Sequence, residues 1–548
     1  MPGTAYVVDA VRSPIGRRNG SLAEIRADEL AAQVLNGLVG RVDVDPGQIE
    51  DVQMGCVTQV GEQALNVGRG AVLVAGWPES VCATTVDRQC GSSLQAAFNG
   101  AAAVQAGHLD LVVAAGIEHM TRVPMGSNLG DAGWGAVNEK IGERWPIVPQ
   151  GISAEVIAEE WGLSRESLDE YSLESHQRAV AAVDEGRFEN EIIPVEVGAG
   201  GAVVLFAVDE TPRRDTSREK LASLQPAFKA DGVVTAGNSS SIVDGSAAML
   251  LASEAALERH GLEPRARFVS FGLSGVESMS RVPMGSNLTA TGFEGFSPKL
   301  YEHWEVVPQG ISAEVIADEW GLSREDLDEY SYESHRRAIA AIDEGRFERE
   351  IVPVETGAGG AAVLVAVDEN PRRDTSLEKL ASLKPAFKED GKVTAGNSSA
   401  IVDGAAAMLV TSEAAAGRLG LEPRGRFVSF GIAGVDPYRM LHGNPLACER
   451  ALAKAGLTWD DIAVIEVNEA FASVVLQFLK DTGLHERWQT GDVNPNGSGI
   501  SLGHPLGATG ARITATLLAE LERREERYGV ASMCIGQGQA IAAVVERL

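Results

Sequence analysis

A long stretch of this sequence occurs twice in tandem, and this repeat constrains the fold more than any other feature. Residues 122–128 (RVPMGSN) return at 281–287, and residues 149–155 (PQGISAE) return at 308–314. Both pairs are offset by the same distance along the chain, 281 − 122 = 159 residues. Solenoid folds need at least three stacked repeats. Two copies therefore indicate that one segment of a globular fold has been duplicated.

Short Gly-apolar-acid matches at the same spacing mark the ends of the two copies. They lead us to expect two α/β halves that flank two consecutive copies of one module. The expected segments are residues 1–117 (N-terminal half), 118–275 (first copy), 276–434 (second copy) and 435–548 (C-terminal half).

Apolar spacing predicts the elements inside and outside the repeat. Residues 152–161 and 164–185 carry apolar side chains at helical spacing, and Ser323 with Asp326 resembles a capping box. Outside the repeat, apolar runs such as 111–115 alternate with helical segments, which is typical of α/β folds with mixed sheets. Each copy is expected to close with a buried helix and strand, at residues 244–253 and 403–412.

Charge and composition exclude several classes of partner. A formal net charge of −30 would repel a phosphate backbone, so nucleic acid is not expected. The sequence contains neither a signal-peptide pattern nor an apolar run near the roughly 20 residues of a membrane span. We therefore expect a cytoplasmic protein. Five cysteines without CxxC spacing indicate neither a zinc site nor a disulfide framework.

Cys90 is a candidate nucleophile. It precedes Gly91, Ser92 and a helical apolar pattern, so we expect it at the start of a helix. Free N–H groups and the helix dipole at such a position favour a thiolate. Taken alone, the motif fits a small buried cysteine without reactivity about as well.

His504 is the second candidate, in a glycine-rich loop at residues 494–510 (NPNGSGISLGHPLGATG). Glycines let the backbone approach a substrate closely, and a histidine among them can act as a base and as an N–H donor to an oxyanion. A histidine on a flexible surface loop is the alternative. The glycine density and Pro505 predict a fixed shape and favour function.

Two weaker motifs complete the set. Asn468, in the segment VNEAFA at a strand end, can hold a water or a carbonyl, and Cys534, in MCIGQGQ, can exchange a proton with a leaving group. Taken alone, each fits a structural role better: an N-capping asparagine and a packed cysteine.

In this order, the four motifs resemble those of the thiolase family over essentially the whole chain, once one copy is set aside. The resemblance implies an α/β fold of two βαβαβαββ-type halves with mixed five-stranded sheets and helices between and outside them. It also implies an α/β loop domain, or lid, over coenzyme A (CoA), here present twice. A homodimer or homotetramer is expected.

The resemblance also implies a role for each motif residue. Cys90 takes the acyl group, His504 helps to deprotonate it and Cys534 shuttles the proton. His504 with a water held by Asn468 forms one oxyanion hole, and the N–H groups of Cys90 and Gly536 form the other. The implied reaction is thiolysis of a 3-oxoacyl-CoA by CoA, as in fatty-acid β-oxidation, or the reverse Claisen condensation, without a metal or redox cofactor.

Candidate CoA contacts occur in both copies. Ser240 and Ser399 match the family's CoA-contacting serine, and Gln150 and Gln309 lie in Pro-Gln-Gly, where the family often has His-Met-Gly. We predict that the second copy (residues 277–434) is the working lid and completes the N-terminal half. Its Ala405 replaces Ser246, whose hydroxyl would be costly to bury without a partner. Its residues 296–299 (FSPK) also resemble the family's lid entry more than residues 136–139 do.

Two alternative functions are carried forward. A ketoacyl-synthase-like condensing enzyme of the same fold would pair its cysteine with two histidines, or with a histidine and an asparagine, and Cys534 argues against it. A catalytically impaired thiolase-like scaffold, with an extra copy that binds a partner, is disfavoured because all four motifs are retained.

Overall fold

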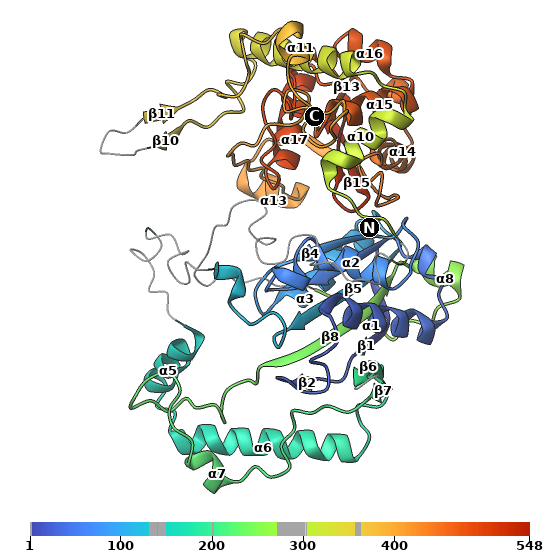
Figure 1. Cartoon of the computed structure of the whole chain (residues 1–548). Coiled ribbons are helices and arrows are strands. Elements are labelled where there is room, and N and C mark those ends of the chain that lie inside the picture. Colours follow the sequence, from blue (N-terminus) through green and yellow to red (C-terminus); the bar gives the residue numbers. More distant parts are fainter. Residues whose placement is uncertain are drawn as a thin grey trace. The chain divides into compact units, whose positions relative to one another are not determined.

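The computed structural model describes residues 3–130, 140, 149–199, 202–270, 302, 304–356 and 363–548. The chain divides into two compact units, Met1–His303 (unit 1) and Trp304–Leu548 (unit 2). Each unit has its own main sheet (Figure 1). The α/β class with mixed sheets that the sequence predicts is therefore confirmed. The division between the units falls inside the second copy and not at the end of a copy.

Unit 1 is built on a mixed seven-stranded sheet in the order β4-β3-β5-β8-β1-β9, with β2 paired to β8. β3 is parallel to β4 and β5, whereas β8 is antiparallel to β5 and β1. The strands are β1 (Tyr6–Arg12), β2 (Gly16–Arg17), β3 (Asp51–Gly55), β4 (Cys82–Val86), β5 (Leu111–His119), β8 (Val243–Ala252) and β9 (Ala266–Arg267).

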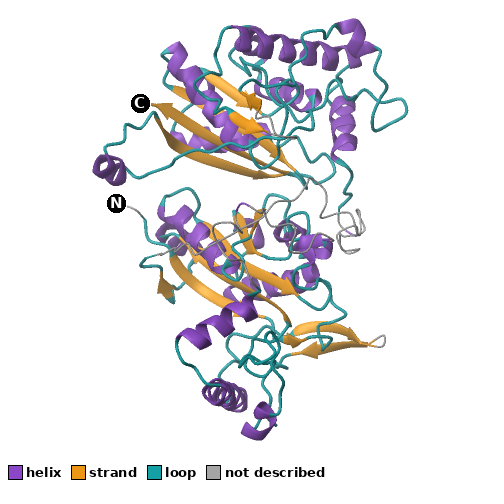
Figure 2. Cartoon of the chain, turned by 90° about the vertical axis from the view of Figure 1, so that its left-hand side faces the viewer, coloured by secondary structure: helices purple, strands orange, loops and turns teal. Residues whose placement is uncertain are grey.

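Helices cover both faces of this sheet (Figure 2). Side chains of β5 alternate between the two faces, as strand geometry requires. Val113 and Ala115 pack into the core that contains α1 and α2, whereas Val112 and Ala114 pack with α3. The covering helices are α1 (Ala27–Val42), α2 (Val67–Val74) and α3 (Ser92–Gln105).

The first copy supplies a central strand of this sheet. β8 lies between β5 and β1, and its Ser246 hydroxyl donates to the Gly116 carbonyl at 2.9 Å. The prediction that the second copy completes the N-terminal half is therefore wrong. It rested on the free-energy cost of burying the Ser246 hydroxyl without a hydrogen-bond partner, and the hydroxyl has one. The helix predicted within 244–253 is also wrong, since helix α8 (Glu254–His260) begins only after the strand.

Helices α5, α6 and α7 of the first copy lie apart from the sheet of unit 1 (Figure 1), whereas Val195 and Val197 of β6 belong to the core that α1 covers. Two of these helices match the predicted ranges closely, yet Trp161 and Tyr171 are each 76% exposed. The elements are α5 (Gln150–Glu160), α6 (Arg165–Asp184), α7 (Arg218–Ala222) and the hairpin of β6 (Val195–Ala199) with β7 (Ala202–Phe206).

Unit 2 has a four-stranded sheet in the order β12-β15-β14-β13. β14 is parallel to β13 and antiparallel to β15. Helices α14 and α15 pack on one face and α17 on the other. The elements are β12 (Gly425–Gly434), β13 (Val464–Val467), β14 (Tyr528–Ile535), β15 (Gln539–Arg547), α14 (Asn444–Ala455), α15 (Ala472–Thr482), α16 (His485–Gln489) and α17 (Thr509–Arg524).

The strand numbers differ from the five that we expected in each half. In unit 1 the additions β2 and β9 have only two residues each. In unit 2 the edge beyond β13 is reduced to one parallel bridge between Ile465 and Val493.

Helices α10 and α11 of the second copy are packed into the core of unit 2. Both helices pack against α15, and Ile316 and Tyr330 belong to the same core as Val474. Ser323 and Asp326 form the predicted capping box at the start of α11. The elements are α10 (Gln309–Glu319), α11 (Arg324–Asp343), α12 (Leu377–Ala381), α13 (Glu413–Leu419) and the hairpin of β10 (Val354–Thr356) with β11 (Val363–Val365).

The second-copy counterpart of β8 is neither the predicted helix nor a strand. Residues 401–411 form no helix or strand, and Leu409 is 80% exposed, whereas its counterpart Leu250 is fully buried in β8. The two copies therefore contribute different parts to the fold: the first supplies β8 to the sheet of unit 1, and the second supplies α10, α11 and the edge strand β12 to unit 2. Residues 136–139 and 296–299, compared above as lid entries, lie outside the described residues.

No helix in the described ranges is both long and apolar enough to cross a membrane.

Candidate active site

Cys90 lies in a tight turn two residues before α3, so its predicted position at a helix start is confirmed. The Ser92 hydroxyl accepts from the Arg88 N–H at 2.9 Å and donates to the Gln89 carbonyl at 2.5 Å. Gln89 has a φ of 47°, a left-handed conformation that this bracing holds in place. Cys90 is exposed, whereas the other four cysteines are buried.

A glycine lets α3 approach the sheet beneath this turn. A Cβ on Gly116 of β5 would lie 2.7 Å from the Ser93 Cβ, closer than two carbon atoms can pack. Glycine at this position therefore helps to set the position of the first turn of α3 and of the cysteine before it.

The first-copy candidates Gln150 and Ser240 belong to unit 1 with Cys90. The Gln150 amide Nε2 donates to the Cys90 Sγ at 3.7 Å. Ser240 is exposed. Gln150 thus contacts the candidate nucleophile itself.

His504 lies in the glycine-rich loop before α17 in unit 2. Gly503 has a φ of 97°, and a Cβ there would overlap the Val402 side chain, so only glycine fits before the histidine. The His504 ring has Nδ1 2.7 Å from the Thr509 hydroxyl and Nε2 3.2 Å from the Asn468 amide nitrogen. Burial of the ring, and then the charge of Arg512, lower the pKa of His504 to about 4.

Asn468 follows β13 directly and is fully buried. Its backbone N–H donates to the Ser532 carbonyl of β14 at 2.9 Å, which fixes the residue at the strand end. Its side-chain amide nitrogen contacts His504, whereas its side-chain oxygen has no hydrogen-bond partner among the residues described. The amide is therefore aimed at the histidine, as a site residue requires.

Cys534 lies on β14 opposite Ala540 of β15 and is buried. Burial raises the pKa of its thiol to about 12, so the thiol stays protonated near neutral pH. Gly536 follows β14, and the Gln309 Nε2 lies 3.7 Å from the place that a Cβ on Gly536 would take. The second-copy glutamine thus approaches a predicted oxyanion-hole residue.

Ser399 lies in a second-copy segment that is bound to the same loops. Its N–H donates to the Ala470 carbonyl at 2.9 Å, and the His504 N–H donates to the Ala400 carbonyl at 3.1 Å. Unit 2 therefore brings together His504, Asn468, Ser399 and their neighbours, while unit 1 holds Cys90, Gln150 and Ser240.

Glu469 is a residue of the site to which the sequence analysis assigned no role. Its buried carboxylate accepts from the Tyr330 hydroxyl at 2.8 Å and the Ser334 hydroxyl at 2.7 Å, both on α11. It also accepts from the Ile500 N–H at 3.1 Å in the loop of His504. The available signal was an acidic residue in an otherwise apolar stretch after a strand.

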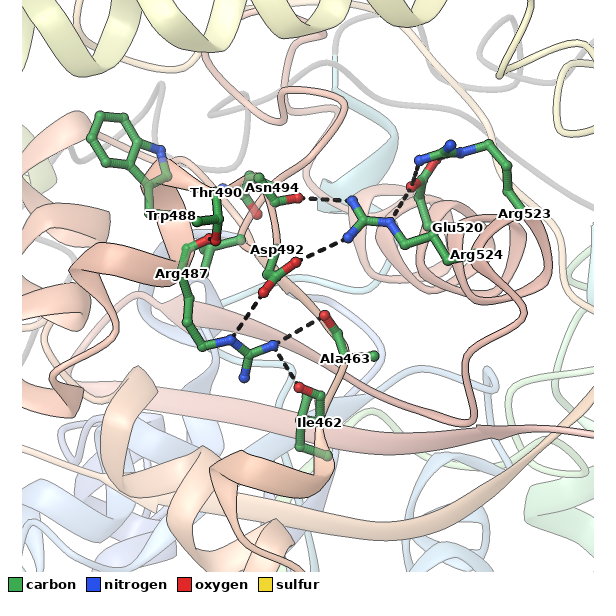
Figure 3. Close-up of polar contacts among 12 residues, drawn as sticks. Ile462, Ala463, Arg487, Trp488, Thr490, Asp492, Asn494, Glu520, Arg523 and Arg524 are labelled. Carbon is green, nitrogen blue, oxygen red and sulfur yellow. Dashed lines mark hydrogen bonds and ion pairs between the residues drawn. The ribbon is translucent and has the colours of Figure 1, made fainter.

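A network of arginines anchors the chain that leads into this loop (Figure 3). Arg487 donates to Asp492 at 3.2 Å, and Arg524 of α17 pairs with Asp492 at 3.1 Å and with Glu520 at 3.0 Å. Burial alone would raise the pKa of Glu520, but hydrogen bonds from Arg523 and Asn496 lower it to about 2. These ion pairs therefore fix the position at which the loop begins.

An exposed cysteine before a helix, and a neutral histidine paired with an asparagine, suit an enzyme that transfers acyl groups. Comparison with known families agrees with this class. The family model "Thiolase, N-terminal domain" matches residues 5–255 and 271–414, and "Thiolase, C-terminal domain" matches residues 421–547. The chain belongs to the thiolase family. It is an acyl-CoA acyltransferase.

Relatives cover nearly the whole chain. A steroid 3-ketoacyl-CoA thiolase of Mycobacterium tuberculosis is 34% identical, over 99% of this chain and 94% of its own length. A beta-ketoadipyl-CoA thiolase of Acinetobacter baylyi is 33% identical, over 99% of both. The crystal structure of an acetyl-CoA acetyltransferase of Bacillus anthracis is 27% identical, with a TM-score of 0.44 over 100% of this chain and 99% of that one.

Proposed function

We propose that this enzyme cleaves 3-oxoacyl-CoA with CoA to acetyl-CoA and a shortened acyl-CoA, or runs the reverse condensation, through an acyl-enzyme on Cys90. The observation that carries the proposal is the position of Cys90: it is exposed in a braced turn before α3, whereas the other four cysteines are buried. The names of the relatives, which are 3-ketoacyl-CoA and beta-ketoadipyl-CoA thiolases, support this substrate class.

The first half-reaction forms the acyl-enzyme. Neutral His504 takes the thiol proton of Cys90, and the sulfur attacks the 3-oxo carbon. The bond between carbons 2 and 3 then breaks, and the enolate of acetyl-CoA leaves with a proton from the Cys534 thiol. The developing oxyanions are held by His504 with a water on Asn468, and by the N–H groups of Cys90 and Gly536.

The second half-reaction restores the enzyme. The CoA thiol gives its proton to the Cys534 thiolate and attacks the thioester carbon. The Cys90 sulfur leaves and takes back the proton that His504 held. All proton transfers use side chains, so the proposal includes no metal or redox cofactor.

The test is a pair of cysteine variants of the full chain with acetoacetyl-CoA and CoA as substrates. We expect Cys90→Ala to abolish turnover. Mass spectrometry should find an acetyl group on the Cys90 peptide of the parent and none on the same peptide of the variant. Cys448→Ala, which removes a buried thiol from α14, is the matched control and should keep both. Turnover of Cys90→Ala within about tenfold of the parent would overturn the proposal and favour a scaffold without catalysis.

We further propose that the second copy holds CoA, because Ser399 lies beside the loop of His504 whereas Ser240 is exposed in unit 1. A bulky change, Ser399→Phe, should raise the KM for CoA, and Ser240→Phe should leave it unchanged. The opposite ranking would assign CoA binding to the first copy. Gln309 and Gln150 remain weaker candidates for CoA contact.

The cellular setting belongs to the same proposal. We infer that the enzyme acts in fatty-acid β-oxidation or a related acyl-CoA breakdown, because the relatives are named for 3-ketoacyl-CoA substrates. A cytoplasmic homodimer or homotetramer is the assembly that we propose from the family resemblance. Analytical ultracentrifugation of the purified chain would decide the subunit number.

A further inference from the structure

The hydroxyl of Thr509 contacts the candidate histidine, although no motif assigned it a role. Thr509 is the first residue of α17 and is fully buried. Its Oγ1 lies 2.7 Å from Nδ1 of His504 and 3.0 Å from the Pro505 carbonyl oxygen. That carbonyl also accepts from the Thr509 backbone N–H at 3.0 Å, so it does not depend on the hydroxyl.

Two arrangements of protons satisfy these contacts. In the first, the hydroxyl donates to Pro505 and accepts from Nδ1–H, so Nε2 of His504 presents a lone pair toward the Asn468 amide nitrogen at 3.2 Å. In the second, the hydroxyl donates to a bare Nδ1 and Nε2 carries the proton. Rotation of the amide would then supply the acceptor, because the Asn468 side-chain oxygen has no partner within the described ranges.

A hydroxyl supports both arrangements because it is a donor and an acceptor at once. In the proposed reaction a bare Nε2 takes the Cys90 proton, and the ring, now protonated on both nitrogens, stabilises the oxyanion through Nε2–H while Nδ1–H keeps its acceptor on Thr509. A methyl group in the same place would offer neither contact. It would leave a buried ring nitrogen without a partner.

We propose that Thr509 is a positioning residue that holds the ring of His504 by keeping a hydrogen-bond partner at Nδ1 in each protonation state of the ring. The inference rests on the proposed function, because it assigns Thr509 a part in the work of that same histidine. Thr509 touches neither the acyl group nor CoA in this proposal and acts only through the ring.

A second threonine on α17 provides a matched control. The Thr514 hydroxyl donates to the Gly510 carbonyl one turn earlier, at 2.8 Å, as threonine often does in helices. It makes the same backbone contact as Thr509 but none with a histidine. Thr514→Val therefore removes the helical contact alone.

The experiment compares Thr509→Val, Thr509→Ser and Thr514→Val in the full chain, with acetoacetyl-CoA and CoA. We expect Thr509→Val to lower kcat by about tenfold to a hundredfold, with the KM for CoA changed less than about twofold. Thr509→Ser should recover to within about threefold of the parent, and Thr514→Val should match the parent. In ¹⁵N NMR spectra of histidine-labelled protein, Thr509→Val should change the ratio of His504 tautomers and Thr514→Val should not.

Parental kcat and an unchanged tautomer ratio in Thr509→Val would overturn the inference. So would a Thr509→Ser variant as slow as Thr509→Val, because the methyl group and not the hydroxyl would then matter. Thr509→Ala, which removes the hydroxyl with less volume, serves with the same readings if the valine variant does not fold. Parental turnover of His504→Ala would overturn the proposed function itself, whereas an inactive His504→Ala beside a fully active Thr509→Val overturns this inference alone.

Discussion

The side chain of His504 is neutral because its surroundings disfavour the charged ring. Burial and the charge of Arg512 lower its pKa to about 4. In the unfolded chain the ring regains its ordinary pKa of about 6.5, so between about pH 6.5 and pH 4 the unfolded state binds a proton and the folded state does not. The stability that this provides is present above about pH 6.5 and is lost as the pH falls toward about 4.

The same shift predicts how activity depends on pH. We expect the rate of acyl-enzyme formation to stay flat from about pH 8 to about pH 5.5, because a base with a pKa near 4 remains neutral there. Rapid-quench measurements with acetoacetyl-CoA would check this. A base with the ordinary histidine pKa would slow by about tenfold over that range, and such a fall would contradict the assignment.

Residues whose chemistry depends on close sequence neighbours could be predicted. Cys90 before a helix and His504 among glycines carry their context in the sequence. The carboxylate of Glu469 does not, because its partners Tyr330, Ser334 and Ile500 are far away in the sequence. Thr509 was missed for another reason: its hydroxyl matters only through the orientation of a ring five residues earlier.

Among the elements, β8 is the strand whose origin in the first copy the sequence analysis did not predict. The two copies offer nearly the same strand, and the choice between Leu250 and Leu409 could not be made from apolar pattern. Our reasoning from Ser246 failed because the partner of its hydroxyl, the Gly116 carbonyl, belongs to a strand outside the repeat. Helices α5 and α6 and the start of α11 were predicted well because helical spacing and capping depend on near neighbours in the sequence.

The different burial of these two leucines predicts different costs of the same change. Leu250→Ala should lower the free energy of unfolding of unit 1 by about 2–5 kcal/mol, because it opens a cavity in a packed core. Leu409→Ala, at a residue that is 80% exposed, should cost less than about 0.5 kcal/mol. Urea unfolding followed by circular dichroism would measure both. The reverse ranking would mean that the second copy fills the sheet.

At the scale of the whole molecule, the chain contains separate cores. Unit 1 holds the cores around α1 and α3, and unit 2 holds those around α15 and α17. Separate cores predict more than one cooperative transition, because two-state unfolding is a property of single small domains.

We expect calorimetry to resolve two unfolding transitions that respond to different variants. Leu250→Ala should lower the midpoint of one. Tyr330→Phe should lower the other, because it removes a buried hydrogen bond to Glu469 worth about 1–3 kcal/mol. Tyr171→Phe, at the exposed counterpart in the first copy, is the control and should shift neither. A single transition that both variants move equally would show that the two cores unfold together.

The exposed segment at residues 401–411 has a consequence for how this gene can change. Since β8 already occupies the sheet, a polar residue at Leu409 costs the fold little, and such changes escape selection. Ser399 and Ala400, immediately before it, are tied by backbone hydrogen bonds to Ala470 and His504 and have no such freedom. Mutations are therefore expected to accumulate within residues 403–411, which leaves the residues just before them fixed and this short exposed segment as raw material for a new role.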